Sequence, residues 1–217
     1  MSSFPVTGSR LDELIAGYYA DIDLGVYESL IVQLEAAREE LDYRADLCDN
    51  RNFDPDIGPD EALKFVSPER LEEVISEFGD KVMAVSDQNQ HHFNALIFKD
   101  LTRTMARTVN EFVQPTSRVQ LMQSGRHWYP SGGYMGWHTN SNVRGFRLYC
   151  SHAKVGDASF FRYRDPLSGE IVTSWDRDGW NFRLFRTDCA PLWHCVYSAT
   201  DRISLGYTIR FLGDEVS

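Results

Sequence analysis

Hydrophobic residues recur at intervals of three and four positions in the first half of the chain, a spacing typical of amphipathic helices. The spacing predicts helices over residues 11–19, 26–46 and 98–112. A further helix is expected from Ser67 to Gly79, because serine caps helices well and Pro68 fits a first helical turn. The polar segment 50–60 contains two prolines and is predicted to be a loop that partly covers the functional site.

The second half of the chain has another pattern, in which short runs rich in aromatic residues are separated by turn sequences, for example at 176–179. This pattern predicts strands and hairpins. In the last run, apolar residues at 203, 205, 207, 209 and 211 alternate with polar ones from Arg202 to Arg210. If the apolar face packs on the helices, the polar face points into the interior, where an arginine needs a carboxylate partner. The alternative is a solvated polar face.

The composition fits one domain over 1–217, with mostly helical support in 1–116 and the site-bearing strands in 117–217, since 42% of 217 residues are hydrophobic. The formal net charge of −10 argues against nucleic acid as the main partner. The N-terminus has no leader pattern, and no apolar stretch approaches the roughly twenty residues that span a bilayer, so no membrane partner is expected. Four cysteines without a Cys-x-x-Cys pair favour a cytoplasmic protein with reduced thiols.

Two histidines and an arginine in the strand-rich half are the candidates for chemistry. His138 and Asn140 share one face of an extended strand, and His194 follows later in an aromatic segment. Two imidazoles and one oxygen ligand on one side of a ferrous ion leave positions open for a co-substrate and dioxygen. Arg202 and Ser204 also share a strand face, and a planar guanidinium binds a carboxylate through two parallel hydrogen bonds.

These residues together resemble the 2-oxoglutarate and Fe(II)-dependent oxygenase superfamily, and within it the prolyl hydroxylase branch. The resemblance covers roughly residues 117–213, about half the chain. Its matching positions are Tyr129, Gly132, Tyr134, His138, Asn140, His194 and Arg202. It implies a mainly β, α+β fold: a double-stranded β-helix, or jelly roll, of about eight strands buttressed by N-terminal helices. It also implies a dioxygenase that uses Fe(II), 2-oxoglutarate and O2 and releases succinate and CO2.

The resemblance further implies a role for each matching residue. His138 and His194 are the expected catalytic residues and, with Asn140, the expected metal ligands. Binding of 2-oxoglutarate is expected from Arg202, Ser204, Tyr129 and Tyr149, and contact with the substrate from Arg147, Trp137 and Arg144. The expected substrate is a small molecule or an amino-acid-like group, and the acidic composition favours a neutral or cationic one.

Asn140 departs from the family pattern, in which the third metal ligand is normally a carboxylate. An amide oxygen is neutral, so iron affinity should be weaker. Three interpretations follow: the amide ligates the metal, a water held by Asn140 does so, or the site has lost its metal and become a binding pocket. The last leads to the alternative function, a non-catalytic jelly-roll module that binds a carboxylate ligand or a protein partner. Chloride as a ligand is disfavoured, because asparagine leaves it little room.

Overall fold

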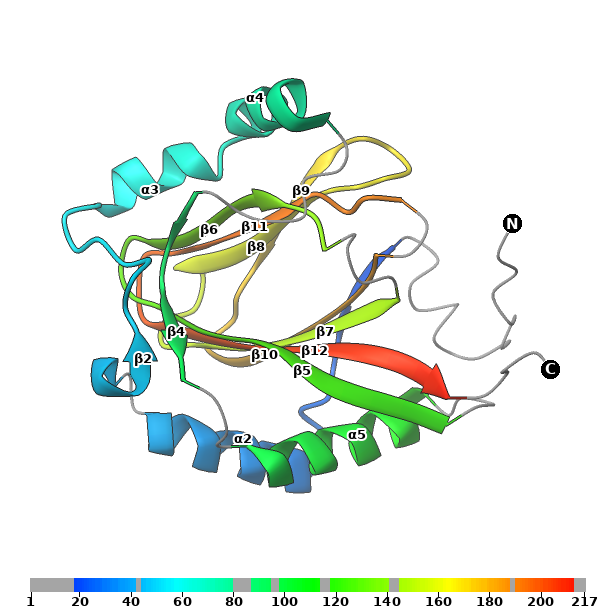
Figure 1. Cartoon of the computed structure of the whole chain (residues 1–217). Coiled ribbons are helices and arrows are strands. Elements are labelled where there is room, and N and C mark those ends of the chain that lie inside the picture. Colours follow the sequence, from blue (N-terminus) through cyan, green and yellow to red (C-terminus); the bar gives the residue numbers. More distant parts are fainter. Residues whose placement is uncertain are drawn as a thin grey trace.

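Two antiparallel β-sheets face each other in the computed structural model of the chain (Figure 1), which describes residues 18–41, 44–79, 87–94, 98–113, 118–140, 145–187 and 190–212. The larger sheet has the order β1 (Tyr19–Ile22), β10 (Gly179–Arg186), β7 (Phe146–Ala153), β12 (Arg202–Leu212), β5 (Arg118–Tyr129), β4 (His91–Phe93) and β2 (Cys48–Asp49). The smaller sheet has the order β3 (Gln88–Asn89), β6 (Gly133–His138), β11 (His194–Ser198), β8 (Ser159–Arg164) and β9 (Ile171–Trp175).

The eight strands β5 to β12 form the central sandwich, and they alternate between the two sheets in jelly-roll order except at β8 and β9, which are neighbours in the smaller sheet. β12 pairs with both β5 and β7, whereas β11 pairs with both β6 and β8. This arrangement confirms the expected fold class, a double-stranded β-helix buttressed by helices. The short strands β1 to β4 extend the edges of the two sheets.

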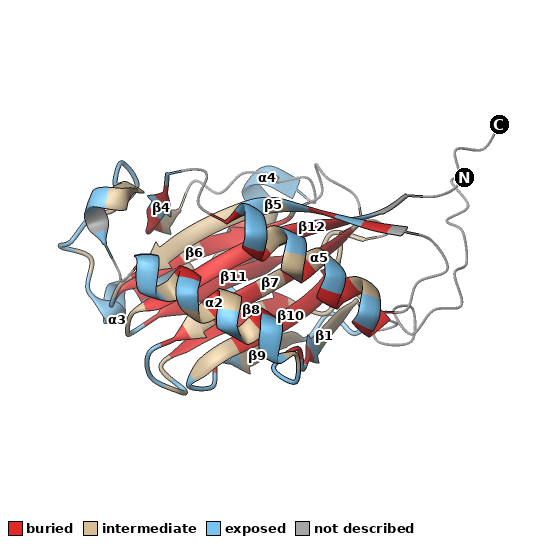
Figure 2. Cartoon of the chain, turned by 90° about the horizontal axis from the view of Figure 1, so that it is seen from below, coloured by how far each residue is buried: buried red, intermediate tan, exposed pale blue. Residues whose placement is uncertain are grey.

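Helices α2 (Glu28–Leu41) and α5 (Lys99–Val113) cover the outer face of the larger sheet (Figure 2). Their buried residues pack on the apolar face of β12, which presents Ile203, Leu205, Tyr207 and Ile209. Burial of such side chains is the main stabilising contribution at this layer. The helix predicted over 98–112 is therefore confirmed to within one residue at each end, and the one predicted over 26–46 is confirmed over 28–41. The polar face of β12 points inward from Arg202 to Thr208, as expected if the apolar face packs on the helices.

Helices α3 (Pro59–Phe65) and α4 (Pro68–Phe78) cover the outer face of the smaller sheet (Figure 1). The predicted caps of α4 are present: the Ser67 hydroxyl accepts a hydrogen bond from the Arg70 amide, Pro68 lies in the first turn, and Gly79 ends the helix. Leu71 and Val74 bury the inner side of α4 against the sheet. The helix expected from Ser67 to Gly79 is confirmed.

The helical interpretation of the first half was too broad. Residues 11–17 lie outside the described part of the chain, but Tyr19 begins β1, which pairs with β10, so the expected helix does not extend to residue 19. The predicted loop over 50–60 ends in α3, which begins at Pro59, and a short 3-10 helix follows α2 at Ala45–Leu47. Strands of two to four residues are too short to display an alternating pattern, so β1 to β4 could not be predicted.

The described helices include none that is both long enough and apolar enough to cross a bilayer.

Candidate active site

An extra residue in the pairing of β6 with β11 decides which way His138 faces. His194 lies opposite His138, but Val196, two positions along β11, lies opposite Met135, three positions away on β6. Such a β-bulge re-aims the side chains beside it. Alternate residues of a regular strand share a face, so His138 would otherwise point to the same side as Tyr134, which packs outward against the helices. With the bulge, His138 and Met135 both face a pocket between the sheets.

Gly136 provides the space that the bulge needs. Its amide donates a hydrogen bond of 2.8 Å to the backbone carbonyl of Asp87. A Cβ atom at position 136 would lie 2.9 Å from that same oxygen, closer than side-chain carbons approach an oxygen in folded proteins. The segment before β3 is therefore packed directly on the backbone of the bulge, and only glycine fits there.

The two predicted histidines meet in the interior. The ring centroids of His138 and His194 are 4.0 Å apart, and both residues are buried. The Nδ1 of His138 lies 2.9 Å from the carbonyl oxygen of Gly136, and the Nδ1 of His194 lies 2.8 Å from that of Leu192. A carbonyl oxygen only accepts, so each Nδ1 carries the proton and each Nε2 keeps its lone pair.

Both imidazoles are held neutral. Burial lowers the pKa of His138 to about 4. Burial, together with the neighbouring His138, lowers the pKa of His194 well below its ordinary value. Neutral imidazoles with a free Nε2 are the form of histidine that binds metal ions.

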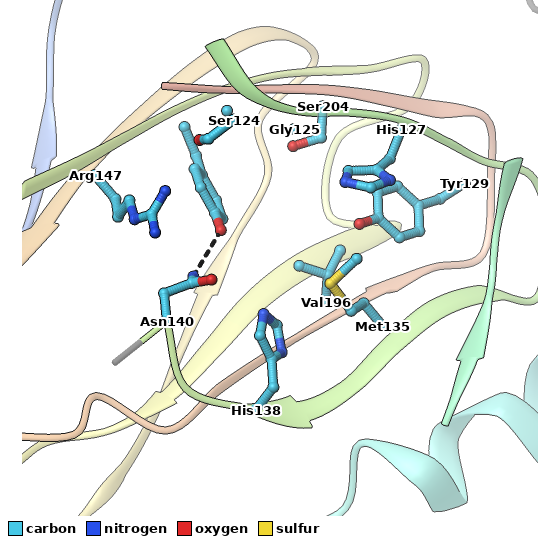
Figure 3. Close-up of a pocket in the computed structure, with 12 residues that line it drawn as sticks. Ser124, Gly125, His127, Tyr129, Met135, His138, Asn140, Arg147, Val196 and Ser204 are labelled. Atoms are coloured by element: carbon cyan, nitrogen blue, oxygen red, sulfur yellow. Dashed lines mark hydrogen bonds between the residues drawn. The ribbon is translucent and has the colours of Figure 1, made fainter. Parts of the chain in front are cut away.

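Asn140 completes this cluster through its side-chain amide. Its Nδ2 lies 3.1 Å from the Nε2 of His194 and donates to the hydroxyl of Tyr149 at 3.0 Å, the dashed line in Figure 3. A half-turn of the amide exchanges its nitrogen and oxygen, so the oxygen can occupy the position that faces His194. Asn140 therefore lies where a third ligand would.

The donor set suits a weakly held divalent metal. In the described part of the chain, no three His, Cys, Asp or Glu side chains come together as a metal site. The cluster instead offers two imidazole nitrogens and one amide oxygen, which matches the ligands of non-haem iron in type but lacks their negative charge. His138, His194 and Asn140 are the residues that would hold the ion.

The pocket between the sheets has a volume of about 190 Å³, roughly six times the share of one molecule in liquid water. Such a volume suits a small organic acid. Figure 3 shows His138 and Asn140 on one wall, with Arg147 and Tyr129 at opposite sides. The lining residues are Ser124, Gly125, His127, Tyr129, Met135, His138, Asn140, Arg147, Tyr149, Val196, Ser204 and Gly206.

Arg202 does not line this pocket, but it lies directly behind the end marked by Tyr129. Its guanidinium carbon is 5.4 Å from the centre of the Tyr129 ring, and the residue is fully buried. Its Nε donates to the carboxylate of Asp176 at 2.8 Å. Its two terminal nitrogens, Nη1 and Nη2, have no hydrogen-bond partner among the residues that the structure describes. The carboxylate expected to meet this buried arginine thus belongs in part to the protein itself.

Asp176 is the centre of a buried charge network. Its carboxylate accepts hydrogen bonds from Arg202, Arg183, Ser151 and Ser159. Burial alone would raise the pKa of Asp176, but the two guanidinium groups and the serine hydroxyl hold it well below the usual range of a carboxyl group. Within the buried network one carboxylate is shared by two arginines, because the second carboxylate near Arg183, that of Asp21, is largely exposed.

The other predicted site residues divide into two groups. Tyr129, Tyr149, Ser204 and Arg147 line the pocket. Trp137 does not: it packs in the outer apolar cluster, and its indole nitrogen donates to the carbonyl of Ser67. The expectation that Trp137 contacts the substrate was wrong for a simple reason, since it adjoins His138 on a strand and must point the other way. Arg144 lies outside the described residues.

The loop over 50–60 does not cover the histidines. The carbonyl oxygen of Ile57 approaches Gly132, in the turn that precedes β6, and Asn89 binds both Asp54 and Gly132. His138 is at the other end of β6, six residues along that strand. The loop therefore closes the end of the sandwich away from the candidate metal ligands.

Two residues, one in the pocket wall and one in the buried charge network, were missed from the sequence. His127 lines the pocket, and burial lowers its pKa to about 3. Its position was accessible to sequence reasoning, because it lies two residues before Tyr129 on one strand and so shares its face. Asp176 was not accessible, since it stands in a sequence that is typical of an exposed turn.

Comparison with known proteins finds likeness only at the level of structure. No family model matches the sequence, and no curated protein matches it. A Pseudomonas putida prolyl-4-hydroxylase structure is similar with a TM-score of 0.54 and 13% identity, over 92% of this chain and 96% of that one. A Trichoplax adhaerens prolyl hydroxylase structure is similar with a TM-score of 0.55 and 9% identity, over 92% of this chain and 89% of that one. The chain has the fold of 2-oxoglutarate and Fe(II)-dependent oxygenases.

Structures of enzymes that catalyse another reaction are also similar to this chain. The non-heme alpha ketoglutarate dependent epimerase of nogalamycin biosynthesis is similar with a TM-score of 0.50 and 12% identity, over 95% of this chain and 87% of that one. At such identities the likeness establishes the fold, and the chemistry has to be argued from the site itself.

The bulge in β6 can be tested with Gly136→Ala. The added methyl group must displace the backbone of Asp87 or of β6, so we expect a loss of about 1–3 kcal/mol in the free energy of unfolding, measured by urea denaturation. Divalent metal binding should weaken as well, because His138 turns away from His194. The matched control is Gly58→Ala, since nothing lies within 4 Å of that position. Equal effects of the two substitutions would contradict the assigned role.

The buried network can be tested with Asp176→Asn, which leaves two buried guanidinium groups without their shared anion. We expect a loss of about 3–5 kcal/mol in the free energy of unfolding. The contribution of Asp176 should be complete above the ordinary carboxyl pKa of about 3.9 and diminish as the pH falls below it, because the folded pKa is lowered. Exposed Asp178→Asn serves as control in the same urea titrations, at pH 7 and pH 3.

Proposed function

We propose that the protein is an Fe(II)- and 2-oxoglutarate-dependent oxygenase that hydroxylates a small molecule or an amino-acid-like substrate. The observation that carries the proposal is the convergence of His138 and His194, each neutral and each with an unprotonated Nε2, beside a small pocket that His138 lines. A buried arginine, Arg202, lies behind the Tyr129 side of that pocket, and its two terminal nitrogens have no partner among the described residues. The fold supports the proposal, because it is the fold of such oxygenases.

His138 and His194 would hold the iron, with Asn140 as third ligand or as the group that positions a water there. Iron bound with 2-oxoglutarate and O2 supplies the oxidising power for hydroxylation, with release of succinate and CO2. The protein's part is to orient the substrate and to exclude water. The apolar residues Met135 and Val196 on the pocket wall serve the second purpose.

Arg202 is the residue that would bind the distal carboxylate of 2-oxoglutarate. Its Nε is held by Asp176, so the two terminal nitrogens remain for a ligand. Buried donors without a partner are costly, and a carboxylate would satisfy both through parallel hydrogen bonds. Ser204, two residues along the same face of β12, lines the pocket and offers a hydroxyl donor beside it.

The alternative is a non-catalytic module that binds a carboxylate ligand. One observation favours it: the amide of Asn140 already contacts the Nε2 of His194, the atom needed for the metal. The two functions differ in a simple way, since the module would bind 2-oxoglutarate or a similar acid without iron and without turnover.

The proposal is tested by adding Fe(II) and 2-oxoglutarate anaerobically and recording the visible metal-to-ligand charge-transfer band. We expect a band and, after admission of air, succinate. Arg202→Ala should raise the 2-oxoglutarate concentration needed for half-saturation by roughly a hundredfold, about 2–3 kcal/mol, whereas exposed Arg210→Ala should leave it within twofold. Absence of both band and succinate in the wild-type protein would favour the binding module.

Asn140 is tested with Asn140→Asp. A carboxylate adds a negative charge beside two neutral imidazoles, so Fe(II) affinity should rise by roughly tenfold or more, about 1.4 kcal/mol. Competition with a chromophoric chelator measures the change, and Asn140→Ala should not reproduce it. An unchanged affinity in the aspartate variant would mean that residue 140 does not lie beside the ion.

A further inference from the structure

Arg147 is a second buried arginine at the pocket, and it lacks a counter-ion among the described residues. It is 5% exposed and lines the cavity from β7. Within the part of the chain that the structure describes, its one hydrogen bond is from Nη1 to the hydroxyl of Thr208 on β12, and its Nε has no partner. Arg183 shows the contrast, since that buried guanidinium has Asp176 and Asp21 within 4 Å.

The surroundings of Arg147 make its charge costly. Burial disfavours the charged form and lowers the pKa of Arg147, and Arg210 on β12 acts in the same direction. Tyr149 is the only described group that favours the charge, and burial raises the pKa of its hydroxyl, so it is neutral. A guanidinium stays charged even so, because its ordinary pKa exceeds 12. An uncompensated buried charge in a cavity wall is the typical mark of an anion site.

A co-substrate anchored at Arg202 would not reach Arg147. The backbone of Arg202 lies opposite Ala153, whereas Thr208, six positions along β12, lies opposite Arg147. Six residues of a strand span about 20 Å. Arg202 stacks on Tyr129, and Figure 3 places Tyr129 and Arg147 on opposite sides of the pocket, with Asn140 and His138 between them. Arg147 is thus on the side left open for a substrate.

We propose that Arg147 binds a carboxylate of the primary substrate, which would make the substrate a small organic acid. The inference rests on the proposed function and sharpens it. The Nε and a terminal nitrogen of Arg147 would donate to the two carboxylate oxygens, with the Tyr149 and Asn140 side chains beside the reacting part of the substrate. The acidic composition of the chain had favoured a neutral or cationic substrate. The local charge of the pocket outweighs that average, because electrostatic recognition acts over about one Debye length.

The experiment uses the full chain loaded with Zn(II) in place of iron, and it has two steps. Isothermal titration first gives the affinity for 2-oxoglutarate of the wild type, Arg147→Gln, Arg147→Lys and Arg210→Gln. Saturation-transfer NMR on the proteins saturated with 2-oxoglutarate then probes two acids, propionate and benzoate, against their amides, propionamide and benzamide. Circular dichroism melting shows whether each variant is folded.

We expect the wild type to bind an acid but not its amide. Arg147→Gln should weaken acid binding by about tenfold or more while changing 2-oxoglutarate affinity less than twofold. Arg147→Lys should retain part of the acid binding, since it keeps the charge but loses the planar fork. Arg210→Gln should behave as the wild type.

Other results separate the two proposals. If Arg147→Gln weakens 2-oxoglutarate binding instead, Arg147 serves the co-substrate, and the substrate assignment is overturned while the oxygenase remains. The assignment also fails if neither acid binds the wild type, or if acids bind the wild type and Arg147→Gln equally. Acid binding through Arg147 in a protein that does not bind 2-oxoglutarate would retain the anion site and remove the oxygenase.

Discussion

The pairing of β6 with β11 is the constraint on which the candidate site depends. One extra residue on β6 shifts the register between Met135 and His138, so that both point between the sheets. The same shift sends Tyr134 and Trp137 outward, where they pack under α3 and α4. The apolar layer outside the sheet and the polar pocket inside it are thus produced by one local irregularity, and the backbone of Asp87 fixes it through Gly136.

A comparable irregularity occurs in the other sheet. The register of β12 against β5 shifts after the pair Gly206 and Gly125, which places Ser124 beside the pocket. Bulges bend and twist the strands that carry them. Each sheet thus has one bulge beside the pocket. The two bulges leave room for the cavity between the sheets, while the backbone hydrogen bonds between strands continue on either side of each bulge.

The interior of the sandwich is not purely apolar, because it contains three buried arginines. Counting partners among the described residues, Arg183 has hydrogen bonds at all three of its nitrogens, Arg202 has one at Nε alone, and Arg147 has a single hydroxyl partner. Buried charges normally meet an opposite charge. Arg183, which has the most partners, is therefore interpreted as structural, and Arg202 and Arg147 as the arginines available to a ligand. Asp176 links the first two, so that the arginine proposed for the co-substrate is held by the same carboxylate that stabilises the fold.

The layers of the fold could be predicted from local patterns along the chain. Helical spacing in α2, α4 and α5 and strict alternation in β12 reflect which side chains must avoid water, and that requirement is local enough to be seen along the chain. The histidine pair and Arg202 could also be identified from the sequence, because their residue types and spacing are unusual. Three other features of the site could not be predicted in this way. The bulge that aims His138, the burial of Asp176 in an apparent turn and the lack of a counter-ion for Arg147 among the described residues all depend on contacts between segments far apart in the chain. No local pattern encodes which partner a buried charge will find.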